Sequence, residues 1–208
     1  MEKLILLAFL LTTPLCSFSY QIDRRNDRIY LSDTSCIQVK EIAQSLAQWS
    51  KSEGSRKTCP IDSQKMRPDF GMCEFDITDC VPDHVAQYQD VTPKFQGPNC
   101  WNLALVMKSI LPALRYSSPE EMAFYMKPPL CRQLSNKEPR LPGDVGAIEN
   151  IYGRSPTESH GFIYISEKIA YSKDGFSNKR PYQLQGLENV YKIYGVPEKK
   201  ECRSNELN

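Results

Sequence analysis

The sequence predicts an α+β fold, and two observations carry that prediction. Before Pro142-Gly143, apolar residues recur at helical spacing, whereas short runs rich in β-branched and aromatic residues follow it. A chain of 208 residues, 40% of them hydrophobic, can bury about one core of ordinary size. Helices first and strands afterwards is the order of an α+β fold with helices packed on one side of a small antiparallel sheet.

Three segments carry the helical pattern, and each follows a residue type that caps helix N-termini. The first is capped by Thr34 or Ser35, the second by Asn99 and the third by Ser118. The cap before the second segment places Cys100 on the first turn of a helix.

Short segments after Pro142 have the composition of strands. The segments at 161–165 and 168–172 are separated only by Ser166-Glu167, which predicts a hairpin. The segments at 182–184 and 190–194 supply one or two further strands. The expected strand segments are residues 145–148, 161–165, 168–172, 182–184 and 190–194.

Residues 55–99 show no sustained period. They contain five prolines and three cysteines. A stretch that cannot build regular structure is a natural place for disulfide bonds, so we predict an ordered loop region held by them.

The N-terminus reads as a secretory signal peptide over residues 1–19. Its apolar run is far shorter than the ~20 residues that span a bilayer, and Ser17 and Ser19 form a small-x-small cleavage site. No later segment approaches membrane-spanning length. We therefore expect a secreted or periplasmic protein.

Cysteine parity changes when the signal peptide is removed. The chain has eight cysteines, and Cys16 leaves with the signal. Thiols pair in an oxidising compartment, so an odd count leaves one cysteine unpaired. The seven that remain are Cys36, Cys59, Cys73, Cys80, Cys100, Cys131 and Cys202.

Composition and motifs argue against several other classes of protein. The formal net charge of +1 lacks the cationic excess of a nucleic-acid binder. No phosphate-binding glycine loop, dinucleotide fingerprint or calcium loop occurs, so we expect no cofactor and no metal. The alternative is a zinc site at Cys73, Cys80 and His84, but secreted thiols tend to oxidise first.

Cys100 has the position of a nucleophile. Unpaired N–H groups and the positive end of the helix dipole favour the thiolate there, which predicts a lowered thiol pKa. Those N–H groups could also stabilise the oxyanion that forms when the thiol attacks a carbonyl group. The alternative is that Cys100 is one more half-cystine.

A thiol nucleophile needs a base, and the chain has two histidines. His84 lies in the irregular region, where a solvated loop histidine is expected. His160 opens the strand at residues 161–165, so its ring projects from a rigid element. We therefore select His160 as the base. With Cys100 assigned as the nucleophile, the other six cysteines are expected to form three disulfides.

The order of these motifs resembles the papain-like superfamily, in particular NlpC-type and CHAP-type cell-wall peptidases. Gly97-Pro98-Asn99-Cys100-Trp101-Asn102 opens a helix, Leu141-Pro142-Gly143-Asp144-Val145 leads into a strand, and His160-Gly161-Phe162-Ile163-Tyr164 begins the next. The match covers roughly residues 96–175. The resemblance implies that Cys100 attacks a carbonyl carbon while His160 transfers the proton.

In the same family a third residue orients the imidazole, and a further side chain lines the oxyanion hole. The third position falls near Asp174, a carboxylate, with Ser172 as the alternative on the same strand. For the oxyanion hole, Gln96 is the candidate and Tyr88 the alternative.

The expected domain organisation is a signal peptide at 1–19, an N-terminal helix with a disulfide-stapled irregular region at 20–99, a catalytic core at 100–196 that the resemblance makes papain-like, and a C-terminal tail at 197–208. The expected function is hydrolysis of an amide bond in peptidoglycan by a secreted monomeric enzyme, either a stem-peptide endopeptidase or an amidase. The alternative is a catalytically inactive papain-like domain that binds cell wall or a protein partner.

Overall fold

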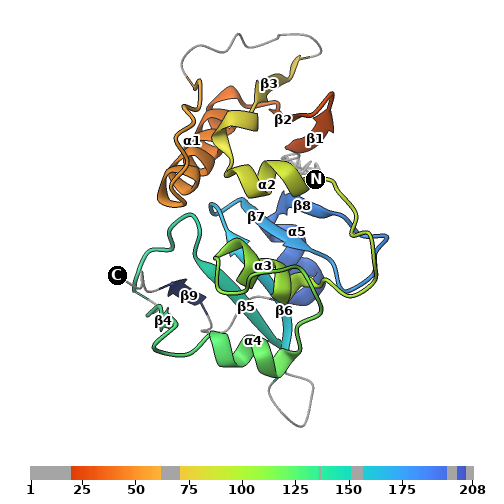
Figure 1. The fold of residues 1–208 in the computed structure, drawn as a ribbon. Helices are drawn as coiled ribbons and strands as arrows, with labels where there is room; N and C mark the ends of the chain where they lie inside the picture. The colour runs from red at the N-terminus through yellow and green to blue at the C-terminus, as the bar shows by residue number, and fades with distance from the viewer. Residues whose placement is uncertain (1–19, 62–70, 136, 151–156, 196–200, 205–208) are drawn as a thin grey trace, which may run out of the picture.

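The computed structural model describes residues 20–61, 71–135, 137–150, 157–195 and 201–204, and within them the predicted α+β class is confirmed. The strands form one three-stranded and one six-stranded sheet, both antiparallel (Figure 1). A single hydrophobic cluster includes residues of both sheets, so the two parts share a core. The predicted signal peptide lies outside the described residues.

The small sheet begins the described chain, where the sequence pattern predicted no element. Asn26 and Asp27 adopt positive φ angles of 50° and 61°, which suits the tight turn of a hairpin. The strands are β1 (Gln21–Arg25), β2 (Arg28–Asp33) and β3 (Cys73–Asp76), in the order β1-β2-β3.

Helix α1 (Cys36–Ser52) confirms the first predicted helix. The Ser35 hydroxyl accepts a hydrogen bond from the backbone N–H of Gln38, and Gly54 follows the helix with a φ of 78°. Its buried face comprises Val39, Ile42, Ala43, Leu46, Trp49 and Ser50.

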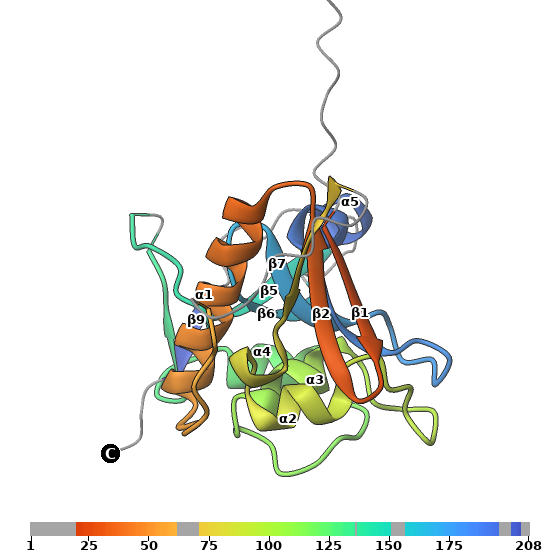
Figure 2. The same cartoon turned by 90° about the horizontal axis from the view of Figure 1, so that it is seen from above.

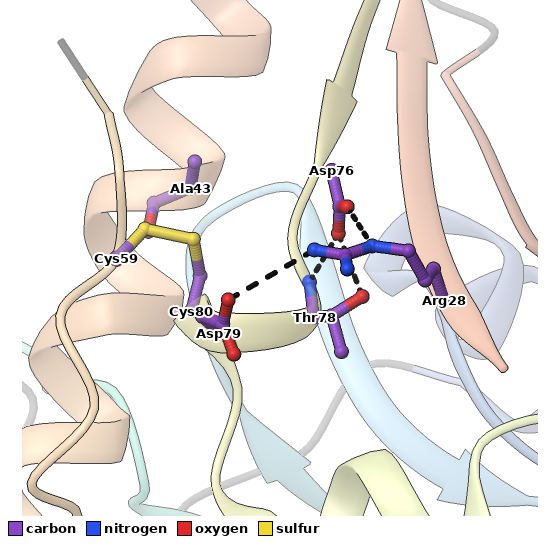
Figure 3. The surroundings of a disulfide bond; sticks show 7 residues. All are labelled: Arg28, Ala43, Cys59, Asp76, Thr78, Asp79 and Cys80. Carbon is purple, nitrogen blue, oxygen red and sulfur yellow. Dashed lines mark hydrogen bonds and ion pairs between the residues drawn. A yellow bond between two sulfur atoms is a disulfide. The ribbon is translucent and has the colours of Figure 1, made fainter. Parts of the chain in front are cut away.

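One disulfide joins the start of α1 to the small sheet, and a second joins the segment after α1 to the turn that follows β3. Cys36 pairs with Cys73 of β3, and Cys59 pairs with Cys80. Figure 3 shows the second bond beside α1, with Arg28 of β2 reaching the carboxylates of Asp76 and Asp79 nearby. The region predicted as stapled loop therefore contains disulfides, and it also forms β3, the 3₁₀ turn η2 (Thr78–Cys80) and helix α2 (Asp83–Tyr88).

The large sheet has the strand order β4-β9-β5-β6-β7-β8. A β-bulge interrupts the pairing of β5 with β6, because Ile148 pairs with His160 whereas Glu149 pairs with Glu158. The strands are β4 (Cys131–Gln133), β5 (Val145–Asn150), β6 (Thr157–Tyr164), β7 (Ile169–Lys173), β8 (Tyr182–Gly186) and β9 (Glu201–Ser204).

Helices cover both faces of this sheet rather than one. Helices α3 (Cys100–Met107) and α4 (Pro119–Tyr125), capped by Asn99 and Ser118 as predicted, pack on one face. Helix α5 (Leu187–Tyr194) packs on the other, where it meets Phe162 and Tyr164. Figure 2 shows the large sheet between α5 and the pair α3 and α4. The prediction of helices on one side only is therefore wrong in this respect.

The expected strand at residues 190–194 is also wrong, because these residues belong to α5. Leu187, Val190, Tyr191 and Tyr194 are spaced i, i+3, i+4 and i+7, which places them on one face of a helix. That face contacts the sheet, so tertiary packing favours the helix over the strand that Val, Ile and Tyr otherwise prefer.

Part of the expected C-terminal tail belongs to the core. Strand β9 pairs with both β4 and β5, and Cys202 of β9 forms a disulfide with Cys131 of β4. Three disulfides in a chain of this size indicate an extracytoplasmic compartment. Among the described residues, no helix is long and apolar enough to span a bilayer.

The disulfides should differ in their contribution to stability. Cys131–Cys202 closes a loop with a sequence separation of 71, whereas Cys59–Cys80 closes one of 21. In the chain-entropy description, Cys131→Ser with Cys202→Ser should lower the free energy of unfolding by about 4 kcal/mol, and Cys59→Ser with Cys80→Ser by about 3 kcal/mol. Urea unfolding of both double variants measures this difference. A larger loss from the shorter loop would contradict it.

Candidate active site

Cys100 is the unpaired thiol, as the sequence predicts. The six cysteines assigned to disulfides form three bonds, and Cys100 is free and buried. It begins α3, directly after the N-cap residue.

The start of α3 is fixed by a buried amide network. The Asn99 Oδ1 accepts a hydrogen bond from the backbone N–H of Asn102 at 3.1 Å, and its Nδ2 donates to the carbonyl of Ser117 at 2.7 Å. The Asn102 Oδ1 in turn accepts from the backbone N–H of Arg115 at 2.8 Å. These bonds tie the first turn of α3 to residues 115–117, so the position of Cys100 is set by its neighbours as well as by its helix.

Gly161 brings α3 unusually close to β6. A Cβ atom at this position would lie 2.9 Å from Cδ1 of Trp101 and 3.2 Å from its Cα. Such contacts leave no room for a side chain, so the first turn of α3 lies against the strand next to His160. The backbone N–H groups of Gly161 and Trp101 consequently favour the thiolate of Cys100.

Burial nevertheless controls the ionisation of this thiol. Cys100 is only 4% exposed, and desolvation raises its pKa to about 11 despite the surrounding N–H groups and the charge of Lys173. The lowered pKa predicted from the helix start is therefore wrong for the structure described here, because the cost of burying the anion exceeds the favourable electrostatics.

His160 is completely buried and makes one hydrogen-bonded contact through its ring. Its Nε2 lies 3.4 Å from the hydroxyl oxygen of Ser172 on β7, and the Gln185 side-chain amide of β8 donates to the same oxygen. Its Nδ1 is buried without a hydrogen-bond partner. Desolvation lowers the imidazole pKa to about 3, so the ring is neutral at physiological pH.

Tyr194 of α5 covers the His160 ring. The ring centroids lie 3.8 Å apart with an interplanar angle of 9°, a close parallel stack. The Tyr194 hydroxyl donates to the Asp174 carboxylate at 3.4 Å.

The structure brings some of the predicted residues together and separates others. Ser172, the alternative for the third position, contacts His160, whereas Asp174 contacts Tyr194 instead. No hydrogen bond joins the Cys100 thiol to the His160 ring in the described part of the chain. The two side chains approach β6 from opposite faces, since Gly161 faces α3 and His160 faces α5.

The two candidates for the oxyanion hole stand apart from the thiol. Gln96 lies in an exposed bend, and Tyr88 packs edge-on against Tyr182 at a centroid distance of 5.6 Å. Neither has a described hydrogen bond to Cys100. The donors that favour its thiolate are the backbone N–H groups of Gly161, Trp101 and Cys100.

The zinc alternative is excluded by its own ligands. Cys73 and Cys80 are each in a disulfide, and the half-buried His84 ring packs edge-on against Trp49 at 6.2 Å. The described residues hold no group of three His, Cys, Asp or Glu side chains arranged to bind a metal ion.

Sequence reasoning missed three residues of this site. Tyr194 was concealed by the incorrect strand at 190–194, although the i, i+3, i+4, i+7 pattern was available. Gln185 sits behind Ser172 through the pairing of β7 with β8, which no sequence pattern specifies. Lys173 is fully buried, and its Nζ donates to the carbonyls of Gly175 at 2.9 Å and Ser177 at 2.8 Å.

Comparison with protein-family models, curated proteins and solved structures found no match for this chain. The functional argument therefore depends on the residues around Cys100 and His160 themselves.

The native protein should present one slow-reacting thiol. Iodoacetamide at pH 7.5 should label the folded protein slowly, because Cys100 is buried and its pKa is raised to about 11. Unfolding without reductant should expose one thiol in the mature chain, and peptide mapping by mass spectrometry should place it at Cys100. Recovery of Cys100 in a disulfide would contradict this assignment.

His160 should make the protein acid-sensitive. Its pKa is about 3 when folded and about 6.5 when unfolded, so between these values the unfolded chain binds a proton that the folded chain does not. Its contribution to stability is complete above pH 6.5 and is lost as the pH falls. The free energy of unfolding should drop by about 2 kcal/mol from this group between pH 7 and pH 5. Urea unfolding of wild type and His160→Asn measures the difference, and equal slopes against pH would refute it.

Proposed function

We propose that this protein is an extracytoplasmic thiol hydrolase of the papain-like superfamily, secreted or periplasmic, that cleaves an amide bond through Cys100 and His160. One observation carries the proposal. Among the described residues, the one unpaired thiol begins a helix packed against the strand that bears His160, whose Nδ1 has no partner while its Nε2 contacts Ser172. An imidazole with one nitrogen oriented and the other unoccupied suits a general base.

The proposed reaction begins from a neutral thiol and a neutral imidazole. His160 accepts the Cys100 proton as the sulfur attacks the carbonyl carbon, and the N–H groups at the start of α3 stabilise the oxyanion. The imidazolium then protonates the leaving amine, and the C–N bond breaks to give a thioester. Water, deprotonated by His160, hydrolyses the thioester to release the acid and restore the thiol. In the structure described here the thiol and the imidazole face opposite sides of β6, so the proposed reaction requires a rearrangement on substrate binding that brings His160 to Cys100.

Ser172 and Gln185 have a positioning role in this proposal. Ser172 holds Nε2 of His160, and Gln185 donates to Ser172 from the adjacent strand. Fixing one ring nitrogen determines which nitrogen is available as the base. Ser172 thus takes the place that the sequence assigned first to Asp174.

The proposed substrate is an amide of peptidoglycan, in the stem peptide or at its attachment to the sugar. The resemblance of residues 96–175 to NlpC-type and CHAP-type peptidases supports this choice, and the three disulfides fit the compartment where peptidoglycan lies.

A second candidate function is binding of cell wall or a protein without cleavage. The observation that favours it is burial, since Cys100 is 4% exposed and His160 is fully buried, with no hydrogen bond between them. A binding domain needs neither group to reach a substrate.

Activity on purified sacculi should separate these functions. Wild-type protein should release soluble muropeptides, and Cys100→Ala should abolish release. Loss of the base in His160→Ala should lower the rate by about 10²–10⁴-fold. Ser172→Ala should lower it about fivefold, the equivalent of one neutral hydrogen bond of about 1 kcal/mol. Release is measured by chromatography with mass spectrometry.

Cosedimentation with sacculi provides the control. Cys100→Ala should still bind if it folds, which circular dichroism checks. Equal release by wild type and Cys100→Ala would refute the hydrolase, and binding without release would establish the second candidate.

A further inference from the structure

The covering of His160 by Tyr194 is the most specific contact around the candidate base. The two rings are parallel within 9° and their centroids lie 3.8 Å apart. On the same face, Phe162 stands 6.4 Å from the His160 ring at an angle of 22°. The imidazole therefore lies between the sheet and the last turn of α5, which explains its complete burial.

Tyr194 is itself held at its polar end. Its hydroxyl donates to Asp174, the residue after the end of β7, at 3.4 Å. Burial and the nearby Asp174 and Cys100 raise the phenol pKa, so the hydroxyl remains a donor throughout the range in which enzymes work. Asp174 thus reaches His160 only through the Tyr194 side chain.

We propose that Tyr194 is a positioning residue for His160, and that Asp174 acts on the site by orienting Tyr194. This proposal rests on the proposed hydrolase function and assigns Asp174 a different role from the one expected from the sequence. The stack fixes the plane of the imidazole on the α5 face of β6, so that Nε2 stays on Ser172. The ring also excludes water from one face of the imidazole.

Exclusion of water keeps the base in its working form. A neutral imidazole accepts a proton, whereas an imidazolium does not. Tyr194 from α5 is the titratable group that contacts His160. Asp174 and Cys100 act electrostatically on Tyr194, and Lys173 at the end of β7 acts on Cys100. Desolvation is the dominant influence on the His160 pKa, so removal of the covering ring should let the imidazole protonate in mild acid.

The experiment compares three variants of the full mature chain. Tyr194→Leu removes the stacked ring, and Tyr194→Phe keeps the ring but loses the hydrogen bond to Asp174. Tyr191→Leu is the matched control, because Tyr191 lies one turn earlier on the same helix and contacts Phe162 rather than His160. NMR of the imidazole protons against pH follows each variant. With two histidines in the sequence, His84→Asn completes the assignment.

The expected results concern His160 directly. In wild type and Tyr191→Leu, the His160 ring should stay neutral at pH 5 and keep the full upfield shift caused by the stacked ring. Tyr194→Phe should keep a neutral ring but show a smaller upfield shift, because Asp174 no longer orients the stacked ring. In Tyr194→Leu the upfield shift should disappear, and a titration midpoint should appear between about pH 5 and 6.5. In activity assays, kcat of Tyr194→Leu should fall about 10-fold to 100-fold with little change in KM, and the acid limb of its pH profile should move toward pH 6.5.

Two outcomes would overturn the proposal. The first is a Tyr194→Leu variant whose His160 shift and titration match those of wild type. The second is an equal change in Tyr191→Leu, which would mark general loosening of α5. If Tyr194→Leu does not fold, the wild-type spectrum decides, because a His160 ring without the upfield shift contradicts the stack. The NMR readout requires no turnover, so absence of activity in wild type refutes the hydrolase alone.

Discussion

The close packing of α3 against β6 at Gly161 is the constraint on which the rest of the candidate site depends. The position has no space for a side chain beside Trp101, and this absence lets the first turn of the helix approach the strand. The approach places the thiol against the backbone N–H of Gly161 and directly beside the residue that carries the imidazole. The Asn99 and Asn102 side-chain amides also bond the start of α3 to the backbone of residues 115–117. The position of Cys100 is therefore set both by the contact with β6 and by these hydrogen bonds.

The same close packing has an electrostatic consequence. It removes water from the thiol, as packing against α5 does from the imidazole, and desolvation disfavours the charged form of each group. The thiol pKa rises to about 11 and the imidazole pKa falls to about 3, so the resting pair is neutral. A helix N-terminus alone would favour a thiolate, which shows that burial can exceed the effect of the helix dipole when the sulfur has no solvent access.

The pairing of strands in the large sheet determines which polar side chain contacts His160. Strand alternation places His160 on the same face as Phe162 and Tyr164, which α5 covers, and Ser172 and Gln185 project onto that face from β7 and β8. Asp174 lies beyond the end of β7, where it meets Tyr194 instead. A spacing of about a dozen residues along the chain could not distinguish these two positions, because residues two apart on a strand share a face and the sequence does not show that β7 ends at Lys173.

The sequence by itself determined the features that depend on residues adjacent in the chain or on the number of cysteines. The helix caps at Asn99 and Ser118, and a first cap at Thr34 or Ser35, follow from local backbone chemistry. Thiol parity together with the helix start selects Cys100 as the unpaired cysteine. Only the tertiary structure decided that residues 187–194 form a helix, that a strand at 201–204 completes the sheet, and that Ser172 and Tyr194 surround His160. Those outcomes arise from packing between segments distant in sequence, and burial, which sets both pKa values, exists only once those segments have come together.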